Sequence, residues 1–311
     1  METKRPYAVF MGFACVDEYY KMDDWLAKGE KANARYIGPT AGGMIANAAC
    51  VCAGYGIKTY VFDVKSTDSS EDFLYEDLEN SNVDVSKVIR LDSVKDGKCL
   101  IFQFPDGDRS IFCINEDPPR YHLNDEQLEF FRNAEFVYGT IGYGDILDDV
   151  KGFMGFLHEN GVKTFFDVES NYYRKDWRDF VRYAHTVSMN EWGLHTFRTN
   201  EGMEEDRFIK EMFDLGIENL LLTLGADGCR LLNRNGLDIA LPANKVDIVD
   251  CTGAGDTMNA TFMASLIMNY EPEYALKFAN AAAGMSITKE GPRGGVTTVE
   301  KVEDFLKKHP L

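Results

Sequence analysis

The alternation of short apolar runs with helix-periodic segments is the feature that most constrains the fold of this chain. The runs are rich in β-branched and aromatic residues, which predicts strands; they are YAVFMG, KTYVFDV, EFVYGTIG, VKTFFDV, HTVSMN, NLLLTLG and CRLLN. Between them, helical patterns cover residues 44–55, 125–131, 146–160, 204–215, 256–269 and 272–289. Such alternation predicts an α/β fold with a doubly wound, mainly parallel sheet flanked by helices.

Two segments, about 13–39 and 95–117, depart from this pattern. They carry alternating polar and apolar residues and turn signals such as Asp106-Gly107, and KCLIFQFPDGDRSIFCIN is typical of a hairpin. We predict that both segments form a small β-sheet, a lid, on a single domain that spans residues 1–311. Two surface loops with incidental alternation are the alternative.

Composition narrows the class of protein. The hydrophobic content of 45% supports a sizeable core, and the net charge of −18 disfavours a nucleic-acid binder, which would need a basic surface for phosphates. The seven cysteines include no C-x-x-C pair, and the five histidines show no metal spacing. This pattern indicates reduced thiols in a cytoplasmic protein rather than a disulfide framework or a zinc site.

The N-terminus resembles a signal peptide only superficially. Lys4 and Arg5 precede a short apolar run, but the acidic pair Asp17 and Glu18 follows it. We predict a buried first strand from about Tyr7 to Met11. No run approaches the ~20 apolar residues of a membrane helix.

The main candidate for a functional motif is the stretch VDIVDCTGAGDTMNATFMASLIMN, residues 246–269. Residues 246–249 have the pattern of a strand end, Gly253 and Gly255 permit a tight turn, and a helix with one apolar stripe is predicted from Asp256. The start of a helix suits a phosphate, although Asp256 as a simple helix cap is an alternative. The chain contains no Walker A string, and the dinucleotide fingerprint fails at Met258.

DCTGAGD resembles the D-T-x-G-A-G-D signature of the ribokinase-like, or phosphofructokinase-B, sugar kinases. Four further stretches resemble family motifs in the same order over essentially the whole chain: GFACVDEYY, AGGMIANAACVCAGYG, LLTLGADGCRLL and FANAAAGMSITKEGPRGG. The resemblance implies a doubly wound α/β domain with a small β-sheet lid. It also implies transfer of the γ-phosphoryl group of ATP to a hydroxyl of a small sugar or nucleoside.

Roles follow from these matched positions. The resemblance implies that Asp256 is the general base, a carboxylate with an ordinary pKa near 4. The remaining implied residues are Gly253, Ala254 and Gly255 for the anion hole, Asp17, Gly42, Gly43 and Asn47 for the sugar, and Asn190, Thr223, Gly225, Gly228 and Asn280 for the nucleotide. Mg²⁺ would bridge the ATP phosphates, and Asp250 with Thr252 matches a monovalent-cation site, such as one for K⁺. Relatives often pair through their lids, which implies a possible homodimer.

Three departures from the family pattern bear on the metal and the acceptor. Gly193 stands where relatives often carry a glutamate that supports Mg²⁺, so Glu191 is the doubtful substitute. Met44 and Ile45 replace the Lys-Gly of ribokinases and phosphosugar kinases, and Asn171 with Arg174 is displaced along its loop. The leading hypothesis is an ATP-dependent kinase of a small, unphosphorylated sugar or sugar acid. A nucleoside kinase and a non-catalytic ligand binder are the alternatives.

Overall fold

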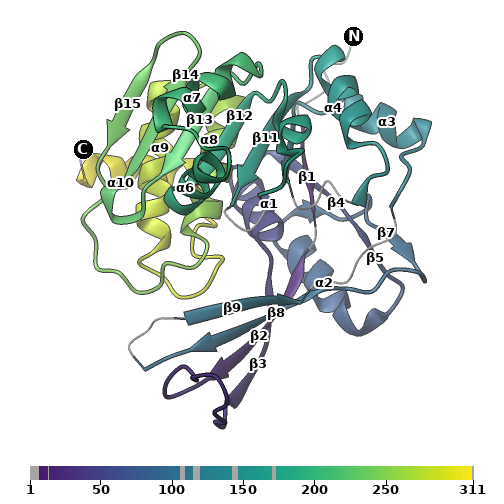
Figure 1. Ribbon diagram of the computed structural model, residues 1–311, viewed down its shortest axis with the longest axis vertical. Helices are drawn as coiled ribbons and strands as arrows, with labels where there is room; N and C mark the ends of the chain where they lie inside the picture. Colours follow the sequence, from purple (N-terminus) through teal and green to yellow (C-terminus); the bar gives the residue numbers. More distant parts are fainter. Residues whose placement is uncertain are drawn as a thin grey trace.

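The computed structural model describes residues 7–12, 14–105, 109–114, 120–141, 146–169 and 173–309. Within these residues a nine-stranded sheet runs in the order β15-β14-β13-β12-β11-β10-β1-β4-β6. Neighbouring strands from β6 to β13 pair in parallel, and only β14 and β15 are antiparallel, which confirms the predicted mainly parallel sheet (Figure 1). The strands are β1 (Tyr7–Met11), β4 (Lys58–Phe62), β6 (Val83–Asp84), β10 (Phe136–Thr140), β11 (Lys163–Val168), β12 (Thr186–Asn190), β13 (Asn219–Thr223), β14 (Cys229–Asn233) and β15 (Asp238–Leu241).

Helices cover both faces of this sheet. Side chains alternate along each strand, so Ala8 and Phe10 of β1 pack in one core cluster while Val9 and Met11 pack in the other. The first cluster includes α1 (Met44–Gly54), α2 (Asp72–Asn80), α8 (Ala254–Ile267), α9 (Pro272–Ser286) and α10 (Val299–Lys308). The second includes α3 (Asp125–Arg132), α4 (Val150–Glu159), α5 (Trp177–Val181), α6 (Glu191–Asn200) and α7 (Glu205–Asp214).

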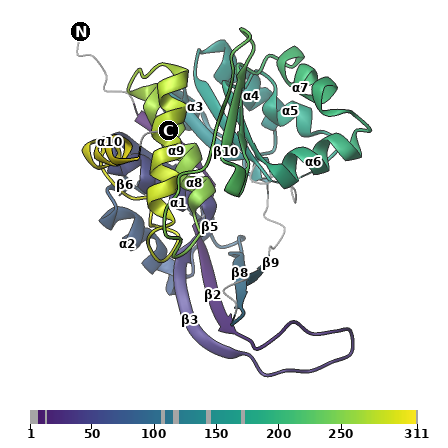
Figure 2. The ribbon, with the colours of Figure 1, turned by 90° about the vertical axis from the view of Figure 1, so that its left-hand side faces the viewer.

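A separate four-stranded sheet, which we call the small sheet, extends from the main body (Figures 1 and 2). Its order is β3-β2-β8-β9, with β2 (Cys15–Lys21), β3 (Arg35–Gly42), β8 (Lys98–Gln103) and β9 (Arg109–Ile114). The two segments predicted to leave the α/β alternation therefore pair with each other, β2 parallel to β8. The Asp106-Gly107 turn lies outside the described residues, and the role of the small sheet as a lid stays a prediction. A further short pair joins β5 (Val64–Ser66) to β7 (Ile89–Leu91).

Two predicted helix starts and one predicted strand were wrong. The helix expected from residue 146 begins at Val150, because the Asp149 carboxylate accepts a hydrogen bond from the Gly152 amide and caps the helix there. Residues 246–249 form no strand; the Val249 amide instead donates to the carbonyl of Ile287. Helix α8 begins at Ala254 rather than at residue 256.

The interior of α8 also differs from the predicted single stripe. Every residue from Thr257 to Ser265 is buried, so this helix is enclosed on all sides rather than amphipathic. Among the residues that the structure describes, no helix combines the length and the apolar character needed to cross a membrane.

Candidate active site

The glycine turn before α8 is held in a conformation that needs glycine. Gly253 has φ 77°, in the left-handed region, and a Cβ there would overlap the carbonyl oxygen of Pro292. Gly253 is the N-cap, and Asp256 is the third residue of the helix, so the alternative that Asp256 serves as the helix cap is wrong. Its carboxylate is therefore available for other contacts.

The first turn of α8 presents the positive end of a long helix. The Ala254 amide already donates to the carbonyl of Cys251 at 3.3 Å, so this amide is used within the turn itself. The amides of Gly253 and Gly255 belong to the same turn, and helix starts leave such groups without intrahelical partners. With the helix dipole, they make this turn a suitable place for an anion.

Two motifs that are 209 residues apart meet at Asp256. The Asn47 side chain on α1 donates from Nδ2 to Asp256 Oδ2 at 2.8 Å. Asn47 is itself buried, and its other side-chain atom, Oδ1, has no hydrogen-bond partner among the described residues. A buried acceptor without a partner is costly. It is thus a position at which a bound hydroxyl could donate a hydrogen bond.

Asp17 lies beside the start of α1, at the base of the small sheet. A Cβ on Gly42 would overlap the Asp17 carboxyl, so glycine at this position lets that carboxyl keep its place. Gly43, the N-cap of α1, has φ 93°. Burial raises the pKa of Asp17 to about 6, and the positive charges of Arg293 and Arg109 oppose that rise. The residues predicted to bind the sugar thus cluster at one place, where β3 leads into α1.

Three carboxyl groups interact near the end of β11: that of Asp167, which is buried, and those of Glu169 and Asp256, which are partly buried. Burial raises the pKa of Asp256 to about 7; the Asn47 hydrogen bond opposes the rise, and the charge of Asp167 adds to it. Burial likewise raises the pKa of Asp167 to about 6 and that of Glu169 to about 8, where Asp167 and Asp256 contribute further. The expectation of an ordinary pKa for Asp256 was therefore wrong. In the absence of ligands, a neutral solution leaves Asp256 only partly ionised.

A hydrogen-bond chain fixes Asp167 in this cluster. Its Oδ2 accepts from Tyr138 Oη at 3.2 Å and from Asn259 Nδ2 at 2.8 Å, and Asn259 Oδ1 accepts from Ser188 Oγ at 2.7 Å. Asn259 follows Asp256 by three residues on α8, so both side chains occupy one face of the helix. Sequence reasoning missed Asn259, although this spacing was a signal that could have indicated it.

The predicted monovalent-cation residues contact an arginine of the small sheet. Arg109 Nη1 donates to Thr252 Oγ1 at 2.6 Å and lies 3.6 Å from Asp250 Oδ1. Burial alone would raise the pKa of Asp250, but hydrogen bonds from Thr252 and from the Gly291 amide, with the charge of Arg109, hold it below its ordinary value. The sequence did not indicate that a positive charge would approach this position from β9.

A second arginine was also missed. Arg293, in the GPRGG loop, places Nη2 2.9 Å from Asp77 Oδ2 and contacts the sulfur of Cys50. Its positive charge opposes the rise in pKa of both Asp17 and Asp256. An arginine among glycines near the C-terminus of a strongly acidic chain was the available signal. The site thus contains two guanidinium groups close to its carboxylates.

The residues predicted to bind the nucleotide lie at the ends of neighbouring strands and in the turn that follows. Asn190, the last residue of β12, pairs in register with Thr223, the last residue of β13. Asn190 caps α6 by accepting from the Gly193 amide at 2.7 Å, and Glu191 is exposed on the first turn of that helix. Gly225 (φ 56°) and Gly228 (φ 96°) form the turn after β13, which includes a 3-10 helix at Gly225–Asp227.

Three further positions named in the sequence analysis are Asn280, Asn171 and Arg174. Asn280 is buried on α9, and its Nδ2 donates to the carbonyl of Pro242 at 2.9 Å, which is a structural contact. Asn171 lies outside the described residues. Arg174 is paired with Asp176.

The chain matches a family model described as pfkB family carbohydrate kinase over residues 7–299. Ribokinase of Bacillus subtilis is 39% identical over 98 residues, which are 32% of this chain and 33% of that protein. Aminoimidazole riboside kinase of Salmonella typhimurium is 27% identical over 293 residues, 87% of this chain and 89% of that protein. Arabidopsis thaliana ribokinase complexed with ribose and ATP superposes with a TM-score of 0.82 at 24% identity, over 97% of this chain and 99% of that one. This last likeness shows a common fold.

Proposed function

Because this chain belongs to the pfkB family of carbohydrate kinases, we propose that it transfers the γ-phosphoryl group of ATP to a hydroxyl of a small, unphosphorylated sugar or sugar acid. The contact between Asn47 and Asp256 is the observation that carries the proposal. It joins the predicted acceptor-binding motif to the predicted catalytic motif at hydrogen-bond distance. An acceptor hydroxyl bound by Asn47 would therefore lie next to the carboxylate that must take its proton.

In the proposed step, Asp256 acts as the general base. The acceptor oxygen attacks the γ-phosphorus as its proton passes to the Asp256 carboxylate, and the bond from that phosphorus to the bridging oxygen of ADP breaks. A pKa of about 7 places Asp256 near the optimum for a base that works at neutral pH. Asn47 would fix both the base and the acceptor.

The turn at residues 253–255 would stabilise the charge on the transferred group. Backbone amides at the start of α8 and the helix dipole supply fixed partial positive charge, without reorganisation during the reaction. Arg109 and Arg293 add two full positive charges nearby. ATP phosphates approaching this turn would thus meet the positive side of the site, while the acceptor meets Asp17 and Asn47.

Mg²⁺ is proposed as the partner of ATP, as in the Escherichia coli ribokinase II structure that contains both, which superposes with a TM-score of 0.77. The ion prefers oxygen ligands and retains several waters. Glu191 could supply such an oxygen ligand, because its exposed carboxylate at the start of α6 can hold a hydrated ion. It adjoins Asn190, which is proposed to bind the nucleotide. When bound, the ion would neutralise charge between the β- and γ-phosphates.

Potassium is proposed for the Asp250 and Thr252 position. Two observations support this. The pKa of the Asp250 carboxyl is lowered, and that carboxylate accepts a hydrogen bond from the Gly291 amide in the loop that follows α9. Arg109 holds positive charge at the same place in this structure. We propose that the guanidinium and K⁺ are alternative partners of the same carboxylate.

A homodimer through the small sheet is proposed because its outer strands expose apolar side chains. Ile111, Phe112 and Ile114 on β9 are about half exposed, and Tyr36 and Ile37 on β3 are similarly exposed. An apolar strand face at a sheet edge favours association with another copy. Light scattering coupled to size exclusion, on wild-type protein and on Ile111→Lys, tests this; a wild-type monomer would contradict it.

The acceptor class is tested by ADP formation over a panel of pentoses, hexoses, sugar acids and nucleosides. The nucleoside alternative is supported by the Salmonella typhimurium relative, whose name gives a riboside as its acceptor. Acceptor-dependent ADP with a phosphate ester in the phosphorus NMR spectrum is expected for a sugar. Turnover on nucleosides alone would overturn the sugar proposal, and ATP binding without any turnover would favour a non-catalytic binder.

A further inference from the structure

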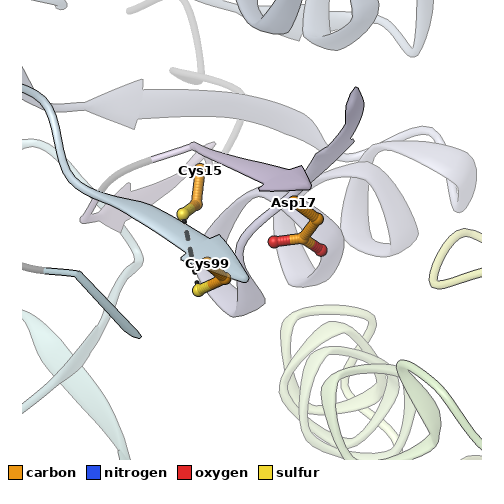
Figure 3. Close-up of side chains that lie close together, drawn as sticks. All are labelled: Cys15, Asp17 and Cys99. Carbon is orange, nitrogen blue, oxygen red and sulfur yellow. Dashed lines mark hydrogen bonds between the residues drawn. The ribbon is translucent and has the colours of Figure 1, made fainter. Parts of the chain in front are cut away.

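Three side chains that could ligate a metal ion converge on one face of the small sheet. Cys15 and Asp17 are two residues apart on β2, so their side chains point to the same face. Cys99 on β8 stands directly opposite Asp17 in the strand register. One ligand atom from each residue lies within 4.8 Å of the others. Figure 3 shows the three side chains close together. This gathering could not be deduced from the spacing of the cysteines in the sequence.

The spacing of the sulfur atoms matches that of ligands around one tetrahedral ion. Cys15 Sγ and Cys99 Sγ are 3.6 Å apart. Zinc–sulfur bonds of about 2.3 Å at tetrahedral angles place two sulfur ligands about 3.8 Å apart. Cys15 and Asp17 are also buried, 2% and 8% exposed, and Cys99 is partly buried. These groups are therefore held in place rather than carried on a solvated surface.

We propose that Cys15, Asp17 and Cys99 bind a zinc-class divalent cation, with the fourth position open to water. Cys113 Sγ lies 3.5 Å from Cys99 Sγ, but it is not within 4.8 Å of all three ligand atoms. The fourth position is therefore left to solvent. Two thiols lose their protons to solvent on binding, so the ligand set carries three negative charges against two on the ion. Arg109 and Arg293, whose charges act on Asp17, offset the excess.

Occupation of this site would block the acceptor position. Asp17 is proposed to bind the acceptor sugar. A carboxylate that coordinates a cation no longer accepts hydrogen bonds from a sugar in the same way. The cation would act as a competitive inhibitor that raises the KM for the acceptor and leaves kcat unchanged at saturating acceptor. This consequence rests on the proposed function, whereas the binding itself does not.

Cobalt is the direct probe of binding, because Co²⁺ bound to thiolates gives a sulfur-to-metal charge-transfer band. We expect the full chain, kept reduced with a phosphine, to develop this band at one Co²⁺ per chain and to lose it when Zn²⁺ is added. Cys15→Ser and Cys99→Ser should each abolish or strongly weaken the band. Cys251→Ser, which removes an exposed thiol elsewhere, should retain it. Absence of the band in wild type, or an equal band in Cys99→Ser, would overturn the proposal.

A measurement on wild-type protein covers the case in which a serine variant does not fold. X-ray absorption of the zinc-loaded chain should show two sulfur neighbours at about 2.3 Å and lighter neighbours completing four-coordination. A shell of oxygen and nitrogen alone would contradict the assignment. In the kinetic arm, Zn²⁺ should raise the acceptor KM of wild type but not that of Cys99→Ser. If no acceptor is turned over, the proposed function fails while the cobalt and X-ray results still decide the metal site.

Discussion

Replacing Asn47 with alanine tests the link between the two motifs of the site. The Asn47 amide donates a hydrogen bond of 2.8 Å to Asp256 and thereby favours the ionised carboxylate. Without it, burial and the charge of Asp167 act unopposed by that bond, so the pKa of Asp256 must rise above about 7. Because the base works only when ionised, activity at neutral pH must fall.

The size of this shift follows from the energy of the bond. A hydrogen bond to a charged group contributes about 1.5–3 kcal/mol, and each pKa unit corresponds to about 1.4 kcal/mol. We therefore expect a rise of about one to two units. At pH 7 the ionised fraction would fall from about half to a few per cent, which lowers kcat/KM by about tenfold beyond any loss of acceptor affinity. Activity should recover as the pH rises toward 9.

The assay is the pH profile of kcat/KM, which reports the pKa of the free enzyme. Loss of acceptor binding scales the whole profile, whereas the change at Asp256 moves its acidic limb to higher pH. Asn160→Ala, at the exposed end of α4, is the matched control and should leave the profile in place. An acidic limb at the same pH in Asn47→Ala and in wild type would refute the reasoning.

Three further predictions concern other parts of the molecule. Gly42→Ala should displace the carboxyl of Asp17 and raise the acceptor KM by about tenfold or more with the ATP KM unchanged; an unchanged acceptor KM would count against Asp17 as a sugar ligand. Glu201→Gln should lower the free energy of unfolding at pH 7 by about 2 kcal/mol, because the hydrogen bond from Arg178 holds the pKa of Glu201 at about 2. This contribution is complete above the ordinary pKa of about 4.5 and is lost as the pH falls toward 2. Chemical unfolding across that pH range should therefore show the stabilities of the variant and the wild type converging. Arg109→Ala should make turnover depend more strongly on K⁺, measured as the ratio of kcat in potassium and choline buffers, and equal ratios in both proteins would contradict a shared cation position.

The sequence predicted the fold where a local pattern carries the information. The strand at Tyr7–Met11 has its predicted bounds, because a continuous apolar run with the strand period determines it. Helix α10 lies outside the predicted set even though Val299, Val302 and Phe305 have helical spacing and pack against the core. Helix α5, with only five residues, is too short to show a period. Its first residue, Trp177, is fully buried.

The sequence motifs indicated some residues of the candidate site but not its electrostatic environment. Family-like motifs indicated Asn47 and Asp256, and the chain folds so that they touch. The raised pKa of Asp256 arises from burial and from the charge of Asp167, and no local motif indicated that these two carboxylates would lie near each other. The approach of Arg109 to the glycine turn depends on how the small sheet meets the main body, which a local pattern cannot specify.

Acceptor-dependent ATP turnover by Asp256→Asn, beside wild type and with ATP affinity measured in parallel, decides whether Asp256 is the general base. Asparagine keeps the size of the side chain and removes the base. We predict a folded protein that binds ATP as wild type does and whose kcat is lower by at least about 10²-fold. Turnover close to that of wild type, with the same acceptor and the same product, would show that Asp256 is not the base.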